Sequence, residues 1–479
     1  MGILAHRVNR QVRIRNCDDN HERIIFISKI KVIDAPCGAG KSSWAIQTMK
    51  SAPDTSFIYC TPFLDEISRV RNSCGHRFIV EPNNYGTTKI EDFNRLLAEG
   101  CNIAVTHSTF INATPETITL IEQGEYVLLL DEALEESVTE FNNLSVIKNS
   151  PEQKIKHGDI EMLIDSKLIS VATDGKVTWI GNEYQDSKFT ELQRLSKLGR
   201  LYLAQDKLML CLFPPEIFNS FQSVYVMTYL FNGCFLKYYF DLFNIEYELA
   251  SINENDGKYS LVDYEPQIDL AHRQQCKELI TICDNERLND GYKKGAFSVS
   301  WCNSNLRDPE VAKRIRTDLT YFFCRIAKAK SGNEDIMWTC LDDWRTKLQG
   351  KGYTCVRQLT AEEKLLPPGK LKELEKDVVC HVPVNARATN RYANRWALAY
   401  LFNMRMNPMV KGFFNSNDVE INEDMFSTAC LIQWIFRSRI RNAQPIMIYI
   451  PSPRMRQLLQ RWLDGADLVI GEEVLPRGV

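Results

Sequence analysis

Short apolar runs alternate with segments of helical periodicity along the first 130 residues of the chain. This alternation predicts strands joined by helices, which is the pattern of a parallel β-sheet. The runs at 57–62, 102–107 and 126–132 predict three strands of this sheet. The run at 126–132 is almost continuously apolar, so we expect both faces of that strand to be covered.

The pattern changes between about residues 135 and 205, where the chain is more polar and less periodic. We interpret this stretch as a subdomain inserted into the first α/β unit. Within it, residues 168–180 predict a hairpin that turns at Asp174-Gly175, a pair favoured in type I′ turns. The alternation of strand and helix resumes at residues 223–228.

A second set of strands and helices occupies the C-terminal half. Its candidate strands are 297–301, 336–339, 378–382 and 446–450. Residues 350–376 are interpreted as a loop or short helices. In the segment 424–442 an apolar stripe recurs at helical spacing, formed by Phe426, Ala429, Ile432, Ile435 and Phe436. The expected fold class is therefore α/β, with two parallel-sheet domains at residues 1–235 and 236–479.

The clearest candidate for chemistry is a glycine-rich turn between a predicted strand and a predicted helix. It consists of Ala35, Pro36, Cys37, Gly38, Ala39, Gly40, Lys41, Ser42 and Ser43, with Ala35 at the position of the first glycine of a phosphate-binding loop. Glycines let backbone N–H groups approach phosphate oxygens, and the helix N-terminus adds a positive dipole. Lys41 would reach the β- and γ-phosphates, and the Ser42 hydroxyl would bind Mg²⁺. The turn predicts binding of ATP with Mg²⁺.

Two further groups complete the predicted site. Asp131 and Glu132 end the apolar run, and an acidic pair there suits triphosphate hydrolysis. Asp131 would hold Mg²⁺, and Glu132 would polarise the attacking water. Gln433, Arg437 and Arg441 recur at a spacing of four, so one helix would present them on one face. A second domain that delivers arginines to a γ-phosphate forms an arginine-finger arrangement.

Composition limits the other possibilities. The chain has 58 Lys and Arg against 61 Asp and Glu, so a nucleic-acid surface must come from local clustering of charge. No apolar run approaches the roughly 18 residues of a membrane span, and we expect no membrane partner and a cytoplasmic location. The 15 cysteines show no CxxC spacing. We interpret them as reduced, mostly buried thiols that hold no structural zinc.

The motifs together resemble those of superfamily-2 helicases of the DEAD/DEAH type. Residues 35–42 resemble the first motif, which often begins with Ala, and residues 131–134 resemble the DEAD/DEAH box with Leu134 in place of the final acid or His. Residues 227–229 stand at the coupling motif, of which only Thr228 matches. Residues 385–390 resemble the fifth motif. Gln433 with Arg437 and Arg441 resembles the sixth, with the last arginine one residue late. The chain as a whole is similar to phage-encoded DEAD-like helicase proteins.

This resemblance implies two RecA-like domains that flank an ATP cleft and move along a nucleic-acid strand as the cleft closes and opens. It also implies that phosphate and sugar groups of that strand contact Thr61, Pro62, Thr106, Thr109 and Thr389. We expect DNA rather than RNA as the nucleic acid. Replication or recombination proteins are candidate partners, and the cytoplasm of a bacterial host is the expected location if a phage encodes the chain.

The sequence leaves several functions open. The first is a nucleic-acid-dependent ATPase that acts as a helicase. The second is an ATP-driven translocase or packaging motor that does not separate strands. The third is a nucleotide-binding regulator with decayed hydrolysis, which the departures at the coupling motif and the last arginine favour and the intact Asp131 and Glu132 oppose. A small-molecule kinase would share only the phosphate-binding loop.

Overall fold

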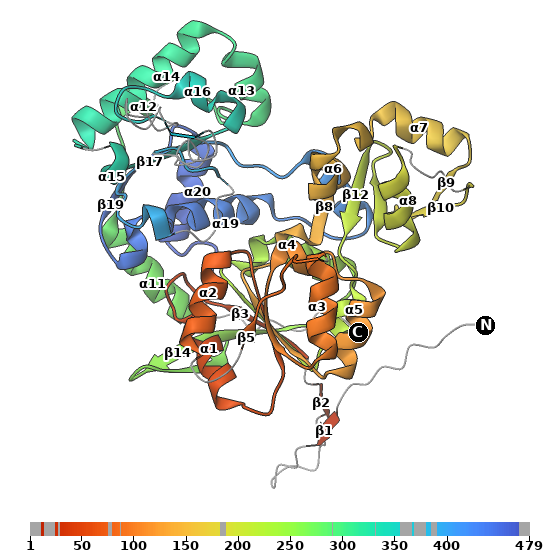
Figure 1. Ribbon diagram of the computed structural model, residues 1–479. Helices are drawn as coiled ribbons and strands as arrows, with labels where there is room; N and C mark the ends of the chain where they lie inside the picture. Colours follow the sequence, from red (N-terminus) through yellow and green to blue (C-terminus); the bar gives the residue numbers. More distant parts are fainter. Residues whose placement is uncertain are drawn as a thin grey trace.

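The computed structural model describes residues 11–13, 24–26, 29–74, 79–86, 88–182, 188–289, 291–330, 332–354, 366–367, 380–384 and 390–468. Figure 1 shows three bodies. The body with the N-terminal sheet lies below, the C-terminal half lies above it on the left, and the inserted subdomain lies above it on the right.

The first sheet has eight strands in the order β15-β14-β3-β13-β7-β4-β6-β5. Its neighbouring strands are parallel, except that β14 and β15 pair antiparallel at one edge. The strand that precedes the glycine-rich turn, β3, is separated from the acidic strand β7 by β13. The strand bounds are β3 (Ile30–Asp34), β4 (Phe57–Thr61), β5 (Ile79–Val80), β6 (Asn102–Thr106), β7 (Val127–Asp131), β13 (Ser223–Thr228), β14 (Glu248–Asn255) and β15 (Lys258–Asp263).

Helices cover both faces of this sheet, as the apolar run at 126–132 predicts. In β7, Val127 and Leu129 pack into the core on one face, and Leu128 and Leu130 pack into the core on the other. Because side chains alternate along a strand, a run without polar positions needs a cover on both sides. One face carries α1 (Lys41–Ser51) and α2 (Leu64–Ser73), and the other carries α3 (Lys89–Ala98), α5 (Pro115–Gln123), α9 (Glu216–Ser220) and α10 (Phe235–Leu242).

The inserted subdomain lies between β7 and β13. Its three-stranded antiparallel sheet has the order β11-β12-β8. Because β12 ends at Leu212, the compact part extends beyond the expected limit near residue 205. Its elements are β8 (Val138–Glu140), α6 (Ser145–Asn149), α7 (His157–Asp165), β9 (Ile169–Val171), β10 (Val177–Trp179), α8 (Thr190–Lys197), β11 (Leu201–Ala204) and β12 (Leu208–Leu212).

The predicted hairpin at 168–180 is confirmed, but its turn is not of type I′. Gly175 has φ +85°, whereas Asp174 is not among the residues with positive φ. The Gly175 N–H donates to the Ala172 carbonyl over 2.9 Å, and the Ala172 N–H donates to the Lys176 carbonyl over 2.9 Å. This is a longer loop in which the glycine alone takes the left-handed conformation. The dipeptide alone could not fix the loop length.

The C-terminal half holds a four-stranded parallel sheet in the order β16-β19-β18-β17. Helices again cover both faces. The bounds are β16 (Ile280–Ile282), β17 (Ile336–Cys340), β18 (Ala397–Leu401) and β19 (Ile446–Tyr449) for the strands, α11 (Pro266–Leu279), α19 (Glu423–Ile435) and α20 (Pro453–Leu463) on one face, and α13 (Val299–Asn305), α14 (Pro309–Tyr321) and α16 (Arg345–Leu348) on the other.

Two strand predictions in this half need correction. Residues 297–301 are not a strand, because the Ser298 hydroxyl accepts the Trp301 N–H over 3.3 Å and caps α13. The aromatic residues there suggested a strand, and the cap three residues before Trp301 is the stronger local signal. Of residues 378–382, the structure describes 380–382, and His381 makes only an isolated bridge with Trp338. Most of the region 350–376 lies outside the described residues.

The chain between β18 and α19 reaches out to the inserted subdomain. We call residues 402–422 the connecting segment; it contains α18 (Pro408–Ser416). The Phe413 ring packs edge-on against Tyr202 of β11 with 5.9 Å between centroids. The Asn407 amide donates to Glu140 of β8 over 2.7 Å. The C-terminal half therefore contacts both the first sheet and the subdomain inserted into it.

Residues beyond the expected domain limit near 235 still belong to the first sheet, because β14 and β15 complete one edge of it. Among the described residues, no helix combines the length and apolarity that a membrane crossing requires. The remaining described elements are β1 (Gln11–Arg13), β2 (Ile24–Phe26), α4 (His107–Phe110), α12 (Glu286–Asn289) and α15 (Gly332–Asp335), together with short 3-10 or π turns.

Candidate active site

A cleft of about 1040 Å³ lies where the carboxyl ends of the first sheet's strands face the C-terminal half. Figure 1 shows α19 above this edge of the first sheet. In a parallel sheet the loops at the carboxyl ends of the strands meet at one edge, which is the usual place for ligands. The lining residues are Cys37, Gly38, Lys41, Ser42, Asp65, Glu66, Arg69, Asp131, Glu132, Met227, Thr228, Tyr229, Arg391, Gln433, Phe436, Arg437, Arg441 and Asn442.

The glycine-rich turn joins β3 to α1, as predicted. Gly38 and Gly40 have φ +89° and +88°, a backbone conformation that favours glycine. The Lys41 ammonium donates to the carbonyl oxygens of Ala35 over 2.5 Å and Pro36 over 2.9 Å. The lysine is thus folded over its own loop, and an anion in the loop would compete with these two carbonyls for the ammonium.

Asp34 fixes the turn to the loop that follows β13. Its carboxylate accepts the backbone N–H groups of Leu230 over 2.8 Å and Phe231 over 3.1 Å. Burial raises the pKa of Asp34 to about 6, and the two N–H donors oppose this rise. The Ala35 N–H also donates to the Thr228 carbonyl over 3.1 Å. The start of the glycine-rich turn is therefore held by residues almost two hundred positions later.

The acidic pair stands at the end of β7. Burial and, to a smaller extent, the nearby carboxylates of Glu132 and Glu66 together raise the pKa of Asp131 to about 7. Glu132 has φ +63°, an uncommon conformation for a residue with a side chain, and its N–H donates to the Met227 carbonyl over 2.9 Å. Such backbone conformations cost energy and concentrate at functional sites. The turn directs the two carboxyl groups into one cleft.

Glu66 and Arg69 of α2 are cleft residues that the sequence analysis missed. The Arg69 Nε donates to Glu66 over 2.8 Å, and the Tyr59 hydroxyl donates to Glu66 over 3.3 Å. Tyr59 is fully buried and also interacts with Asp131 and Ser42. The sequence did hold a signal that could have identified Glu66 and Arg69. They lie in α2, the helix that follows a strand ending at the cleft. Arg391 and Asn442 also line the cleft and were missed.

Gln433, Arg437 and Arg441 all line the cleft, although one continuous helix does not present them. Helix α19 ends at Ile435, so Arg437 lies beyond it and Arg441 lies in a 3-10 turn (Arg439–Asn442). The predicted helix over 424–442 is therefore wrong in its second half. The Arg437 Nη2 lies 3.7 Å from Glu132 Oε1, and the Arg437 side chain is 8% exposed. Arginine from the C-terminal half thus meets an acid from the first sheet.

Residues 227–229, at the end of β13, also line the cleft. Of these, Tyr229 reaches into the C-terminal half. Its hydroxyl donates to Asp269 of α11 over 2.6 Å and accepts the Trp462 indole N–H of α20 over 3.2 Å. The loop after β13 therefore contacts both halves, although only Thr228 of this triplet matches the motif noted in the sequence.

The residues expected to contact nucleic acid lie at the same edge of the first sheet. Thr61 is buried at the end of β4, and its hydroxyl donates to Asp131 over 3.4 Å. The following Pro62 is partly buried. The Thr106 and Thr109 hydroxyls are buried and lie 3.1 Å apart. Thr389 lies outside the described residues.

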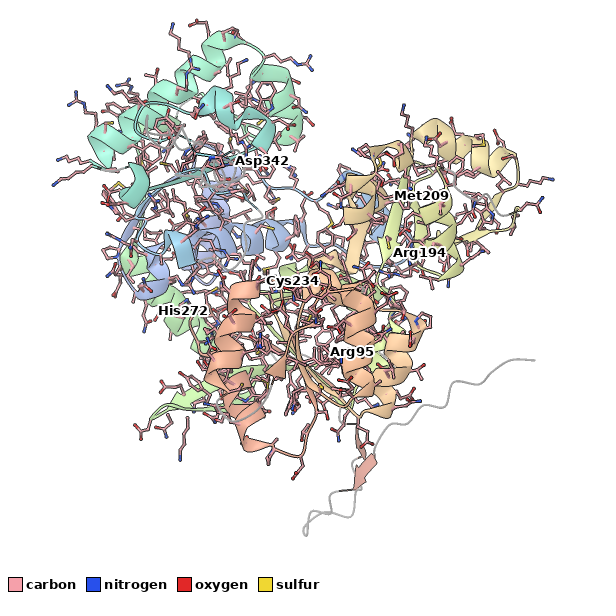
Figure 2. The ribbon with its side chains drawn as sticks, viewed as in Figure 1. Arg95, Arg194, Met209, Cys234, His272 and Asp342 are labelled. Atoms are coloured by element: carbon pink, nitrogen blue, oxygen red, sulfur yellow. The ribbon has the colours of Figure 1, made fainter. Side chains whose placement is uncertain are left out.

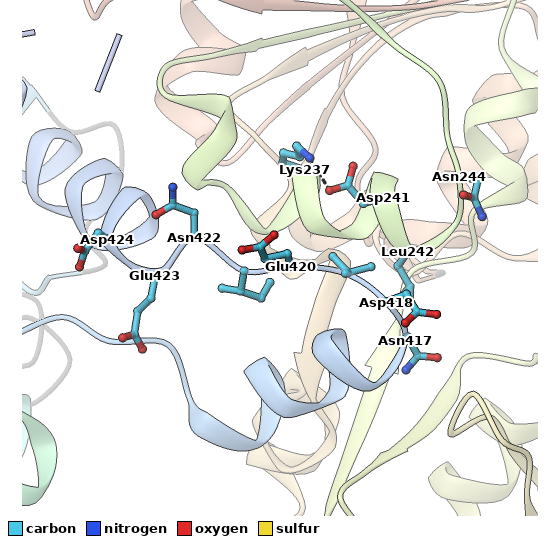
Figure 3. A pocket seen from close by; sticks show the side chains of 12 residues that line it. Lys237, Asp241, Leu242, Asn244, Asn417, Asp418, Glu420, Asn422, Glu423 and Asp424 are labelled. Carbon is cyan, nitrogen blue, oxygen red and sulfur yellow. Dashed lines mark hydrogen bonds and ion pairs between the residues drawn. The ribbon is translucent and has the colours of Figure 1, made fainter. Parts of the chain in front are cut away.

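A second cavity of about 1000 Å³ lies between α10 and the C-terminal end of the connecting segment (Figure 3). Its charged residues are mostly acidic, with Lys237 paired to Asp241. Glu423 pairs with Arg405 over 2.8 Å, and Asp424 pairs with Arg454 over 2.6 Å. An acidic wall repels a triphosphate. This cavity is therefore a poor nucleotide site, and the cleft with Lys41 is the better one.

The cleft suits Mg²⁺ by the chemistry of its donors. Mg²⁺ prefers oxygen ligands and is commonly bound through one or two protein groups with phosphate oxygens and waters. Negative charge is concentrated around Asp131, because Glu132 and Glu66 lie near it. A divalent cation would offset this charge. The described residues include no group of three or more His, Cys, Asp or Glu that could hold a metal ion.

Two family models match the chain. The model described as the YonV middle domain matches residues 151–211, and the one described as the YonV C-terminal Rossmann-like domain matches residues 274–463. The first match falls within the inserted subdomain. The second contains the whole four-stranded parallel sheet of the C-terminal half.

Solved structures are similar to the chain at low sequence identity. One named XPD_APO has a TM-score of 0.50 and 11% identity, and the match covers 91% of this chain and 95% of that chain. Another, named XPD_Helicase, has a TM-score of 0.47 and 12% identity, with coverage of 91% of this chain and 95% of that one. The first likeness shows the fold. The chain shares the fold of XPD_APO, which confirms the predicted α/β fold class.

One curated relative matches along almost the whole chain. It is the SPbeta prophage-derived uncharacterized protein YonV of Bacillus subtilis (strain 168), which is 33% identical over 453 residues. The match covers 92% of this chain and 100% of that protein. Together with the two domain matches, this full-length similarity shows that the chain belongs to the YonV family.

Proposed function

We propose that the chain is a nucleic-acid-dependent ATPase of the helicase type. One observation carries the proposal: side chains of the kinds that ATP hydrolysis requires face each other across one cleft, from two parts of the molecule. Lys41, Asp131 and Glu132 come from the first sheet, and Arg437 comes from the C-terminal half, 3.7 Å from Glu132. When a nucleotide site is divided between two bodies, nucleotide binding can move one body relative to the other.

The side chains have distinct roles in this proposal. Lys41 and the N–H groups of the turn would bind the β- and γ-phosphates, and Glu132 would orient the attacking water. Arg437 and Arg441 would stabilise the charge on the transferred phosphoryl group. Mg²⁺, held through Ser42 and Asp131, would neutralise charge on the phosphate oxygens.

Single-stranded DNA is the partner that we propose for the edge of the first sheet beyond the cleft. The hydroxyl-bearing loops after β4 and β6 lie at this edge, close to the proposed ATP site. Contacts from such loops go mainly to phosphate and sugar, so we expect little sequence preference. Closure on ATP and opening after hydrolysis would move the C-terminal half relative to these loops.

The first test is ATP turnover with and without single-stranded DNA or RNA. We expect nucleic acid to stimulate turnover, Lys41→Ala to abolish it, and Arg437→Ala to reduce it by at least about 1000-fold, the scale of an arginine finger. Arg439→Ala is the matched control, because Arg439 lies over the Trp396 ring and is not among the residues that line the cleft. Its turnover should stay near that of the unsubstituted protein.

Three outcomes would contradict the proposal. Turnover that survives Lys41→Ala would show that the ATPase lies elsewhere. ATP turnover that is the same with and without nucleic acid would show that the ATPase does not depend on nucleic acid. Tight ATP binding without turnover under any condition would instead support a nucleotide-binding regulator. A strand-displacement assay then separates a helicase from a translocase that does not part the strands.

A further inference from the structure

The peptide unit between Asp131 and Glu132 is held by hydrogen bonds on both of its sides. Its N–H, which belongs to Glu132, donates to the Met227 carbonyl of β13 over 2.9 Å. Its carbonyl, which belongs to Asp131, accepts a hydrogen bond from the His107 ring, with 3.0 Å between Nε2 and the oxygen. The orientation of this peptide sets the φ of Glu132, and φ determines where the Glu132 carboxylate points.

His107 comes from a strand end that is not adjacent to β7. It is the first residue of α4 and directly follows β6, and β4 lies between β6 and β7 in the sheet. The residue is 1% exposed and is not among those that line the cleft. His107 therefore contacts the backbone of the acidic pair without lining the cleft itself.

The hydrogen bond to Asp131 also fixes the proton on the ring. A carbonyl oxygen can only accept, so Nε2 must carry the proton. The other ring nitrogen, Nδ1, is buried and has no hydrogen-bond partner among the described residues. Glu136 Oε2 lies 3.8 Å from Nδ1, beyond hydrogen-bond distance. Within the described part of the chain, the bond to the Asp131 carbonyl is thus the one hydrogen bond that the imidazole makes.

Glu132 needs this support because its backbone conformation is unfavourable. Its φ is +63°, and a residue with a side chain keeps such a φ only where the surrounding structure holds it. On one side the support is β13, which pairs with both β3 and β7. Cys234, labelled in Figure 2 at this edge of the first sheet, contacts the Thr228 hydroxyl at the end of β13, with Sγ 3.7 Å away. On the other side the support is the side chain of His107.

The carboxyl group of Asp131 is held separately from the peptide. The Thr61 hydroxyl, at the end of β4, donates to Asp131 Oδ2 over 3.4 Å. Loss of the His107 ring should therefore leave this contact in place and release the peptide that carries Glu132. The expected effect falls on the residue proposed to orient water, and not on the one proposed to hold Mg²⁺.

We propose that His107 is a positioning residue for ATP hydrolysis: by holding the Asp131–Glu132 peptide, it keeps the Glu132 carboxylate directed at the attacking water. The proposal rests on the proposed function and deepens it. A catalytic group misplaced by about 1 Å can lower a rate about 100-fold, so a small rotation of the peptide would suffice. A histidine that only satisfied a buried carbonyl would affect stability, without a selective effect on turnover.

The test compares three replacements of His107 in the full chain, with single-stranded DNA present. Leu removes the donor, Gln places an amide N–H near the position of Nε2, and Asn places one near Nδ1, too short to reach the carbonyl. His107→Leu and His107→Asn should lower kcat by about 10- to 100-fold, and His107→Gln should recover most of this loss. His157→Leu is the matched control, because His157 also begins a helix, α7, but its side chain is 48% exposed.

Two further measurements separate positioning from a structural role. The dissociation constant of a non-hydrolysable ATP analogue should stay near that of the unsubstituted protein, because the glycine-rich turn is unchanged. In a Glu132→Gln background, His107→Leu should have little further effect on kcat, since the group that it positions is already lost. Thermal unfolding shows which variants are folded, and the comparison of Gln with Asn remains decisive if the Leu variant does not fold.

The outcomes distinguish this inference from the proposed function. If His107→Leu turns over ATP as fast as the unsubstituted protein, or if Gln loses as much as Asn, the inference is wrong and the ATPase proposal stands. The inference is also wrong if only the affinity for the analogue falls, or if the losses from His107→Leu and Glu132→Gln multiply. If the unsubstituted protein does not hydrolyse ATP at all, both proposals fail.

Discussion

Gly38 and Gly40 share a positive φ but meet different surroundings. A Cβ added to Gly40 would lie 2.1 Å from the Tyr259 ring carbon Cε1, whereas a Cβ on Gly38 would meet nothing within 4 Å. The Tyr259 backbone is anchored beside α1, because its N–H and carbonyl both hydrogen-bond to the Gln47 side chain, over 3.2 and 3.1 Å. Gly38 is therefore needed only for its backbone conformation. Gly40 is needed also because the Tyr259 ring lies too close to leave room for a side chain.

This difference predicts unequal effects of two identical substitutions. Gly38→Ala should lower the free energy of unfolding by about 1–2 kcal/mol, the cost of a left-handed residue with a side chain. Gly40→Ala adds a steric clash and should cost roughly 1–3 kcal/mol more. Denaturant unfolding of both variants measures the difference. Equal losses would show that Tyr259 yields without cost and that packing at Gly40 is unimportant.

At the scale of elements, α11 and α20 are joined to the end of β13 by a buried polar cluster. Arg273 is completely buried and donates to Asp269 through Nε over 3.0 Å and through Nη2 over 2.8 Å. It also contacts Asp467 over 2.5 Å. Asp269 in turn accepts the Tyr229 hydroxyl. Tyr229, a residue that lines the cleft, is thus held by two helices of the C-terminal half.

Replacing Arg273 should lower the free energy of unfolding more than replacing a surface lysine of the same helix. Arg273→Met leaves two carboxylates without their buried cation, which typically costs about 3–5 kcal/mol of unfolding free energy. Lys277→Met is the control, because the Lys277–Asp464 pair is exposed and such pairs contribute roughly 0–1 kcal/mol. Thermal unfolding of both variants measures the contrast. A loss for Arg273→Met no larger than that of the control would contradict the prediction.

At the scale of the whole molecule, the connecting segment ties the inserted subdomain to the C-terminal half. Phe413 is 2% exposed and packs on Tyr202 of the subdomain. The segment leads directly into α19, after which Arg437 enters the cleft. Any movement of the C-terminal half relative to the first sheet must therefore strain this contact or carry the subdomain along.

Phe413→Ala should loosen the contact, because replacing a buried phenylalanine costs about 3–5 kcal/mol of local packing. We expect faster amide hydrogen exchange in β11 and α18, while exchange in β7 at the centre of the first sheet stays slow. Val171→Ala, at an exposed position of the same subdomain, is the control. Unchanged exchange in β11 would show that the subdomain is held by other contacts.

Local signals predicted much of this fold, and two segments were misassigned because one local signal was weighed wrongly against another. Apolar runs and the glycine-rich turn located β3, β4, β6 and β7 because each signal lies within a few residues. Residues 297–301 were misassigned because the cap at Ser298 outweighs the aromatic side chains there. The one-helix model of residues 424–442 failed because α19 ends at Ile435, although the cleft still brings Gln433, Arg437 and Arg441 together.

The sequence by itself determined the features that depend on neighbours along the chain: a glycine-rich turn between strand and helix, an acidic strand end and a group of arginines. These follow from backbone conformation and periodicity, which a few consecutive residues set. Only the tertiary structure decided that Arg437 meets Glu132 and that Glu66 and Tyr59 surround Asp131. Such contacts arise from how distant segments pack, and packing depends on the whole set of buried surfaces rather than on any local pattern.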